Sequence, residues 1–239
     1  MRTHDEALQQ RAQRDAIQIA IDGPAAAGKS TIGSALAVAL DCRYLDTGLM
    51  YRALTWLALE RDMVPAEDGE LAGLARQMAF SLSPDQAGVL CMNGKPLGGE
   101  LRASRIDLLV SRVASYPDVR AVLVEQQRRL AAEGCIVLVG RDIGTVVLPD
   151  ARVKLWISAS AEERAARRMR EGLSDGGVAD ELARIRARDA TDAGRAVSPL
   201  RQADDAIVIE TDRMSQDDVL TVALEAVAQR LTDPLPPPR

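Results

Sequence analysis

Short apolar runs alternate with longer amphipathic stretches along most of the chain. Buried strands are predicted at 17–22, 43–46, 135–139, 153–158 and 206–210. Helices are predicted near 29–40, 47–61, 118–133, 160–171, 178–190 and 216–231. Two helix starts, Ser160-Ala-Glu-Glu163 and Ser215-Gln-Asp-Asp218, carry capping signatures. This alternation predicts a three-layer α/β/α fold with a five-stranded parallel sheet.

Residues 79–103 break the alternation. Weak period-two patterns surround Asn93-Gly94, which is a strong hairpin signal, so a small antiparallel insert is expected there. Residues 1–16 are polar, and we expect a loosely ordered extension. The core domain is expected over 17–232, and the proline-rich tail at 233–239 is expected to be extended.

The first predicted strand leads into a phosphate-binding loop. Gly23, four further residues and Gly28-Lys29-Ser30 lie between a strand and a helix, the context that this motif requires. Backbone N–H groups of such a loop and the helix start can surround a polyphosphate. The ATP-binding residues are therefore expected to be Gly23, Pro24, Ala25, Ala26, Ala27, Gly28, Lys29, Ser30 and Thr31.

Two side chains near this loop suggest roles in the chemistry. Lys29 is placed to reach the β- and γ-phosphates, and the Ser30 hydroxyl to bind Mg²⁺, the expected cofactor. Asp46 ends the second strand. It is expected either to cap the next helix or to hydrogen-bond a ligand of the magnesium ion without contacting the ion itself.

Composition excludes several other classes. The net charge of −5 in 239 residues gives no general nucleic-acid footprint. The cysteines are odd in number and far apart, and His4 is the only histidine, so disulfides, zinc sites and Ser-His-Asp catalysis are not expected. No apolar run approaches the ~18 residues of a membrane span, and the polar start does not resemble a secretory signal. A cytoplasmic protein is expected.

Three further segments narrow the function. They are Leu45-Asp46-Thr47-Gly48 with Tyr51-Arg52, the stretch Gly140-Arg141-Asp142-Ile143-Gly144-Thr145-Val146-Val147, and Arg195-Ala-Val-Ser-Pro-Leu200. With the phosphate-binding loop, they closely resemble bacterial cytidylate kinases, P-loop nucleoside-monophosphate kinases, over about residues 17–231. The resemblance implies a monomer that transfers phosphate from ATP to CMP or dCMP. It also implies a helical lid at about 164–182 and a nucleotide-binding role for the insert.

The resemblance also implies roles for individual residues. The CMP phosphate would be held by Arg52, Arg141 and Arg195, the ribose by Arg188 and Asp192, and cytosine by Ser111, Arg120 and Asp142. Thr47 and Tyr51 would complete the CMP site. Catalytic residues would be Lys29, Arg141, Arg164, Arg167 and Arg168. The phosphate-binding loop departs from the family at Ala25-Ala26, where relatives usually have Ser-Gly, so a stiffer or slightly reshaped loop is expected.

The residue types also suit this chemistry by themselves. A phosphate acceptor is mostly ionised at neutral pH, so the reaction needs charge neutralisation more than a general base. Arginine pairs bidentately with phosphate. A carboxylate at Asp142 could accept from the cytosine amine and would face an oxygen of uracil. Two alternatives stay open, a kinase with another small acceptor and a protein that binds ATP without catalysis. Arg164, Arg167 and Arg168 could also form a solvated helix face.

Overall fold

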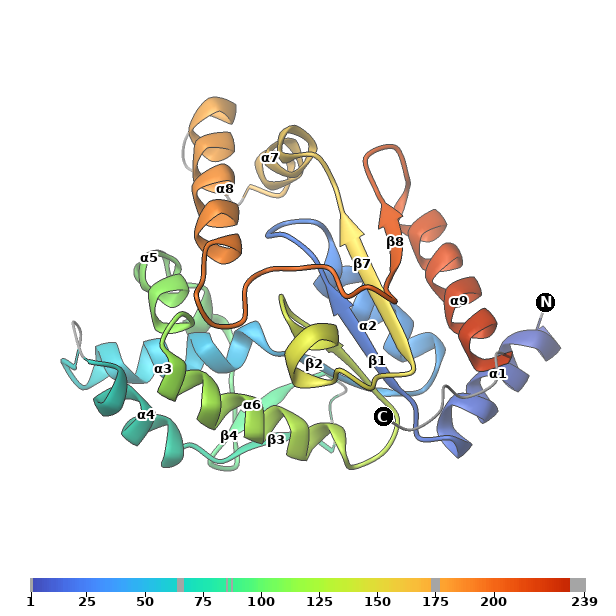
Figure 1. Ribbon diagram of the computed structural model, residues 1–239, viewed down its shortest axis with the longest axis horizontal. Helices are drawn as coiled ribbons and strands as arrows, with labels where there is room; N and C mark the ends of the chain where they lie inside the picture. The colour runs from blue at the N-terminus through green and yellow to red at the C-terminus, as the bar shows by residue number, and fades with distance from the viewer. Residues whose placement is uncertain (1, 64–66, 85, 87, 173–176, 233–239) are drawn as a thin grey trace.

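A computed structural model describes residues 2–63, 67–84, 86, 88–172 and 177–232. Its centre is a five-stranded parallel sheet, as predicted, and its strands lie in the order β2-β6-β1-β7-β8 (Figure 1). The strands are β1 Gln18–Asp22, β2 Arg43–Asp46, β6 Ile136–Val139, β7 Val153–Ser158 and β8 Ile207–Glu210. Ile21 lies opposite both Val139 and Leu155. The three central strands therefore end at a common edge.

Helices cover both faces of this sheet, which confirms the three-layer prediction. Ile19 and Ile21 of β1 belong to one hydrophobic core, whereas Ala20 belongs to the other. The first core is shared with α2 (Lys29–Ala39), α9 (Gln216–Thr232) and α1 (Arg2–Arg14). The second is shared with α3 (Gly48–Glu60), α4 (Asp68–Arg76), α5 (Ser104–Val113) and α6 (Pro117–Ala131).

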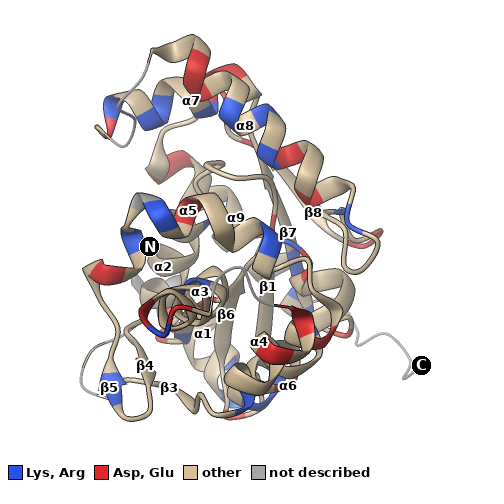
Figure 2. Ribbon diagram, turned by 90° about the vertical axis from the view of Figure 1, so that its left-hand side faces the viewer, with Lys and Arg blue, Asp and Glu red and all other residues tan. Residues whose placement is uncertain are grey.

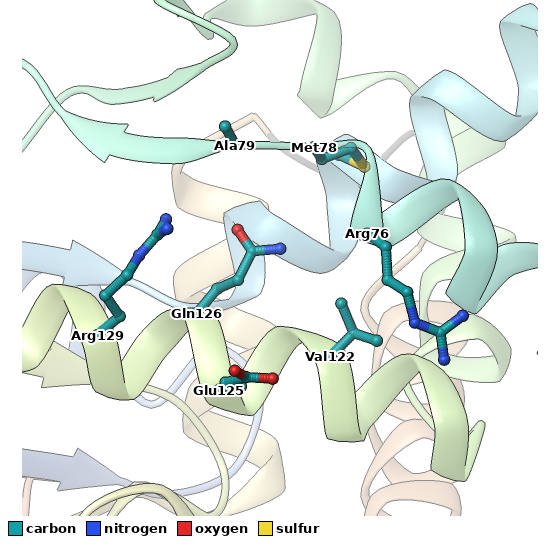
Figure 3. Close-up of a pocket in the computed structure, with 7 residues that line it drawn as sticks. All are labelled: Arg76, Met78, Ala79, Val122, Glu125, Gln126 and Arg129. Carbon is teal, nitrogen blue, oxygen red and sulfur yellow. The ribbon is translucent and has the colours of Figure 1, made fainter.

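The insert is a small antiparallel sheet in the order β3-β4-β5, as predicted. Its strands are β3 Phe80–Leu82, β4 Leu90–Met92 and β5 Lys95–Pro96, followed by a 3₁₀ helix at Gly99–Arg102. Gln126 and Arg129 of α6 attach it to the core: Gln126 Oε1 accepts from the N–H of Phe80 at 3.4 Å, and Arg129 Nη2 donates to Phe80 O at 3.2 Å. Both line a shallow hollow of about 420 Å³ between α6 and the insert (Figure 3).

The pattern of the sequence did not predict helices α4 and α5. Helix α4 is nine residues long and includes Gly69 and Gly73, which lower helix propensity. It forms because Leu71 and Leu74 are buried and because Glu70 accepts from the N–H of Glu67 at 3.2 Å. Tertiary packing thus overrides a weak local signal.

Two helices project beyond the edge where the strands end, and we call them the lid: α7 (Ala161–Arg170) and α8 (Val178–Ala193) (Figure 1). Helix α7 starts as predicted, because the N–H of Glu163 donates to Ser160 Oγ at 3.2 Å. Ser215 and Asp218 form the other predicted cap, at the start of α9. Residues 173–176 of the predicted lid and the tail at 233–239 lie outside the described residues.

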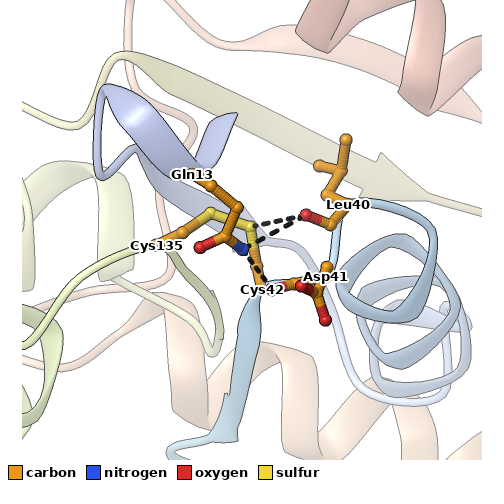
Figure 4. Close-up of a disulfide and its surroundings, with 5 residues drawn as sticks. All are labelled: Gln13, Leu40, Asp41, Cys42 and Cys135. Carbon is orange, nitrogen blue, oxygen red and sulfur yellow. Dashed lines mark hydrogen bonds between the residues drawn. A yellow bond between two sulfur atoms is a disulfide. The ribbon is translucent and has the colours of Figure 1, made fainter. Parts of the chain in front are cut away.

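The opposite edge of the sheet corrects two predictions. The start of the chain is helical rather than loosely ordered: Ala12 is fully buried, and Gln13 Nε2 donates to the carbonyl groups of Asp41 and Leu40. Cys42 and Cys135 form a disulfide with a Cα–Cα distance of 5.0 Å (Figure 4). Each directly precedes one of the paired strands β2 and β6, so the sheet topology joins cysteines 93 positions apart.

No helix in the described parts of the chain is long and apolar enough to cross a membrane.

Candidate active site

A cavity of about 870 Å³ lies at the edge where the parallel strands end. The loops that follow β1, β2, β6 and β8 line it, together with α5, α6 and the lid. This is the location expected of a ligand site in an open parallel sheet. The lid above it carries interleaved basic and acidic residues, as Figure 2 shows.

The phosphate-binding loop has the backbone geometry that its glycines were expected to provide. Gly23 has φ +147°, and a Cβ there would lie 1.9 Å from the carbonyl oxygen of Ile157, so no other residue fits. Gly28 has φ +89° at the start of α2. Ala26 has φ +60°, so an alanine adopts a left-handed conformation that glycine adopts without strain.

Lys29 is buried beneath this loop. Its Nζ donates to the carbonyl oxygen of Pro24 at 2.5 Å, and the residue as a whole is only 5% exposed. Burial, followed by the charge of Arg141, holds the pKa of Lys29 well below its usual range. A bound polyphosphate would supply the negative charge that this buried ammonium group lacks.

Ser30 and Asp46 meet at the mouth of the same loop. Ser30 Oγ donates to Asp46 Oδ2 at 2.7 Å, while Asp46 Oδ1 accepts from the N–H of Gly48 at 3.0 Å. Asp46 therefore both supports the start of α3 and contacts the predicted magnesium ligand. Hydroxyl and carboxylate oxygens are the ligand type that Mg²⁺ takes alongside phosphates and water, so these residues fit that ion.

The opposite side of the cavity contains a buried ion pair. Arg120 of α6 donates through Nη2 to Asp142 Oδ2, and both side chains are less than a tenth exposed. Arg120 also donates to Ala114 O at 3.2 Å and lies 5.6 Å from the centre of the Tyr51 ring. Ser111 lines the cavity nearby, so the predicted cytosine set and Tyr51 occur together.

The predicted phosphate and ribose residues form one cationic cluster. Asp192 accepts from Arg141 Nε at 3.0 Å and from Arg195, whereas Arg52 pairs with Asp107. Burial and the nearby charge of Arg141 lower the pKa of Arg188 to about 10. The buried Nε atoms of Arg188 and Arg195 have no hydrogen-bond partner among the described residues. The cluster thus has more donors than acceptors, which favours an anionic ligand.

The three predicted lid arginines differ in their contacts. Arg167 and Arg168 line the cavity; Arg167 donates to Thr211 O at 2.6 Å, and Arg168 pairs with Glu181 at 2.7 Å. Arg164 is only 5% exposed. It donates to the Ala25 carbonyl at 3.0 Å and to Asp189 at 2.6 Å, so it connects the lid to the phosphate-binding loop and is not a solvated face.

Sequence analysis missed one buried carboxylate beside the cavity. Asp22 ends β1 and is 4% exposed, and its two oxygens accept from the N–H groups of Ile143 and Gly144. The sequence contains a signal for it, because Asp22 is a charged residue at the end of an otherwise apolar buried strand. The single-turn π-helix at Ile143–Val147, whose first N–H groups donate these bonds, had no comparable signal in the sequence.

Comparison with known proteins decides the family. A family model described as cytidylate kinase matches residues 19–229. The chain belongs to the cytidylate kinase family. This confirms the resemblance drawn from the motifs.

Curated cytidylate kinases are similar over nearly the full chain. The one from Rhodococcus jostii (strain RHA1) is 43% identical over 217 residues, which are 89% of this chain and 95% of that protein. The one from Geobacillus sp. (strain WCH70) is 42% identical and covers 91% of this chain and 99% of its own length. The one from Exiguobacterium sibiricum is 46% identical, with coverages of 85% and 93%.

Proposed function

We propose that this chain transfers the γ-phosphoryl group of ATP to CMP or dCMP, giving ADP and CDP or dCDP. The observation that carries the proposal is one cavity with two unlike halves. The phosphate-binding loop with Lys29 lines one half, and the Arg120–Asp142 pair with the arginine cluster lines the other. Membership of the cytidylate kinase family supports the same activity.

ATP binds with its phosphates in the loop from Gly23 to Thr31. Backbone N–H groups of the loop and of the first turn of α2 donate to the phosphate oxygens. Lys29 exchanges its bond to the Pro24 carbonyl for the β- and γ-phosphates. Ser30, supported by Asp46, would hold a magnesium ion, which would offset the charge that develops on the phosphates.

CMP binds in the other half. Asp142 accepts a hydrogen bond from the exocyclic amine of cytosine, and Arg120 and Ser111 donate to the ring nitrogen and the carbonyl oxygen. Uracil would present a second oxygen to the Asp142 carboxylate and leave a buried charge unpaired, which favours CMP over UMP. Arg188 and Asp192 hold the ribose hydroxyl groups. Thr47 donates to the CMP phosphate after its hydroxyl leaves the Val139 carbonyl, to which it donates at 2.9 Å.

Transfer itself needs alignment and charge neutralisation. The CMP phosphate is its own nucleophile, since it is mostly ionised at neutral pH. Arg52, Arg141 and Arg195 hold it in line with the γ-phosphate. Arg167 and Arg168 come from the lid, so they complete the site when the lid closes over both nucleotides and excludes water. Arg164 acts differently, because its bond to the Ala25 carbonyl fixes the loop.

The decisive experiment measures ADP formation from ATP and Mg²⁺ with CMP, dCMP, UMP, AMP and shikimate as separate acceptors. We expect CMP and dCMP to be turned over at least about a hundredfold more efficiently than AMP or shikimate, because a site built to hydrogen-bond a polar edge strongly rejects ligands that lack it. Fast turnover of shikimate alone would favour a metabolite kinase. Tight ATP binding with no transfer to any acceptor would favour a non-catalytic nucleotide-binding protein.

A further inference from the structure

Asp22 lies between the two halves of the cavity without lining it. It is the last residue of β1, and the phosphate-binding loop begins at the next residue, Gly23. Its carboxylate bonds in the other direction: Oδ1 accepts from Ile143 N at 2.8 Å and Oδ2 from Gly144 N at 2.7 Å. The side chain of Asp22 therefore contacts the loop after β6, while its backbone leads directly into the loop after β1.

The two N–H groups belong to the segment that presents Arg141 and Asp142 to the cavity. Ile143–Val147 form a single π-helical turn, with Asp142 as the residue before it. The first N–H groups of a helical turn have no acceptor within the turn. Asp22 supplies both acceptors from 121 positions earlier in the chain. The peptide groups that follow Asp142 are thus held by a side chain of the strand that carries the ATP loop.

We propose that Asp22 is a positioning residue that aligns the CMP-binding loop with the ATP-binding loop. The inference rests on the proposed function, since it assigns the loop at 140–145 to CMP. Asp22 touches neither nucleotide. Its carboxylate fixes the position of the backbone that carries Arg141 and Asp142. It therefore sets the distance between the acceptor phosphate and the γ-phosphate.

Stability does not explain this carboxylate. Burial raises the pKa of Asp22 from 3.8 to about 6, even though two backbone N–H groups and the charge of Lys29 favour the ionised form. An ionised Asp22 at neutral pH therefore works against folding. An asparagine has the same shape and no charge, but its amide can accept from only one of the two N–H groups and directs its own N–H toward the other.

The test compares Asp22→Asn with the unchanged protein in full steady-state kinetics. Turnover of CMP by the unchanged protein comes first, because its absence would overturn the proposed function and not this inference. For Asp22→Asn we expect the KM for CMP to rise about tenfold or more, since hydrogen bonds to a charged group are lost. The KM for ATP should change by less than about threefold, because Asp46 is a larger compensating charge for Lys29 than Asp22 is.

Two further variants make the test specific. Val227→Ala shortens a fully buried side chain of α9, a helix outside both loops, and so lowers stability. Gly144→Ala reaches the same contact from the other side, because its Cβ would lie 3.4 Å from Asp22 Oδ2 and 3.1 Å from Lys154 Cδ. It should raise the KM for CMP as Asp22→Asn does, and it keeps the test available if Asp22→Asn does not fold.

The outcomes divide cleanly. A rise in the KM for CMP that exceeds the rise for ATP in Asp22→Asn or Gly144→Ala, and not in Val227→Ala, supports positioning. Unchanged KM values, equal rises for both nucleotides, or the same split in Val227→Ala would overturn it.

Discussion

The two edges of the central sheet differ in what they contain. At the carboxyl edge are the buried charges of Asp22, Lys29, Arg120 and Asp142. At the amino edge are a disulfide and a helix, α1, that packs on α9 and donates to the end of α2. Strand β6 connects them with four residues, or roughly 13 Å at 3.3 Å each. The buried charges and the cross-link thus lie at opposite ends of the same strands.

This separation yields a general expectation. Changes at the carboxyl edge should alter kinetics more than stability, and changes at the amino edge should do the reverse.

Lys29→Ala should have the largest kinetic effect. Removing the ammonium group takes away a buried charge that the transition state needs, so we expect kcat/KM for CMP phosphorylation to fall about a thousandfold. The same change removes a buried cation whose pKa is lowered by desolvation, so thermal stability should be equal or higher. Coupled ADP assays and a thermal unfolding scan measure both. A destabilised Lys29→Ala would break the proposed contrast between the edges.

Asp142→Ala should also lower kcat/KM, because it weakens the half of the cavity that binds CMP. It leaves the buried Arg120 guanidinium without its carboxylate and removes the acceptor for the cytosine amine. We expect kcat/KM for CMP to fall by about a hundredfold or more, and discrimination against UMP to shrink with it. Competition between CMP and UMP in one reaction measures the discrimination directly. A variant that keeps the original preference would show that cytosine is recognised elsewhere.

The disulfide provides the matching test at the amino edge. The cross-link joins cysteines 93 positions apart, which corresponds to about 4.6 kcal/mol of stability on a chain-entropy account. Cys42→Ala/Cys135→Ala should therefore lower the Tm by on the order of 10 °C, with KM values for both nucleotides unchanged. Cys91→Ala is the control, because Cys91 is buried but free. Equal losses in the two variants would mean that the disulfide adds nothing beyond packing.

The fold was largely predictable, whereas the contacts between distant segments were not. The strands, the main helices and both serine caps follow from local periodicity and capping. The Cys42–Cys135 bond depends on β2 and β6 being neighbours, which follows only from the strand order. The helix at Arg2–Arg14 is mostly polar and forms a contact surface through Leu8 and Ala12, too few apolar positions for a confident pattern.

The candidate site follows the same division. The phosphate-binding loop and the motifs at 45–52, 140–147 and 195–200 indicated many of the residues that line the cavity. Side-chain geometry decides the rest. Arg164, Arg167 and Arg168 are close in sequence, yet only Arg164 turns inward to the Ala25 carbonyl. Asp192 pairs with Arg141 and Arg195, although the resemblance grouped it with Arg188 at the ribose.

The pH dependence of stability should reveal Asp22. Its pKa is raised from 3.8 unfolded to about 6 folded, so the protonated group contributes stability that is complete below about pH 4 and lost as the pH rises through 6. This difference between the unfolded and folded pKa of Asp22 corresponds to roughly 3 kcal/mol of folding free energy. Asp22→Asn has no carboxyl group that titrates in this range. Its Tm should therefore rise relative to the Tm of the unchanged protein as the pH increases from 4 to 7. Asp142 and Lys29, which face Asp22, are present in both proteins. A constant difference in Tm would contradict the buried ionisation.

The smallest effect belongs to Ala26, in the phosphate-binding loop. Its φ of +60° costs an alanine about 1–2 kcal/mol relative to the right-handed region, and a glycine there pays about 0.5–1 kcal/mol in chain entropy instead. Ala26→Gly should therefore stabilise the fold slightly, by about 0.5–1 kcal/mol, a gain that denaturant unfolding can resolve. Ala27→Gly, outside the positive-φ region, is the control and should destabilise. If Ala26→Gly also raises the KM for ATP, the strained methyl group keeps the loop in its binding shape, and strain at the carboxyl edge contributes to function.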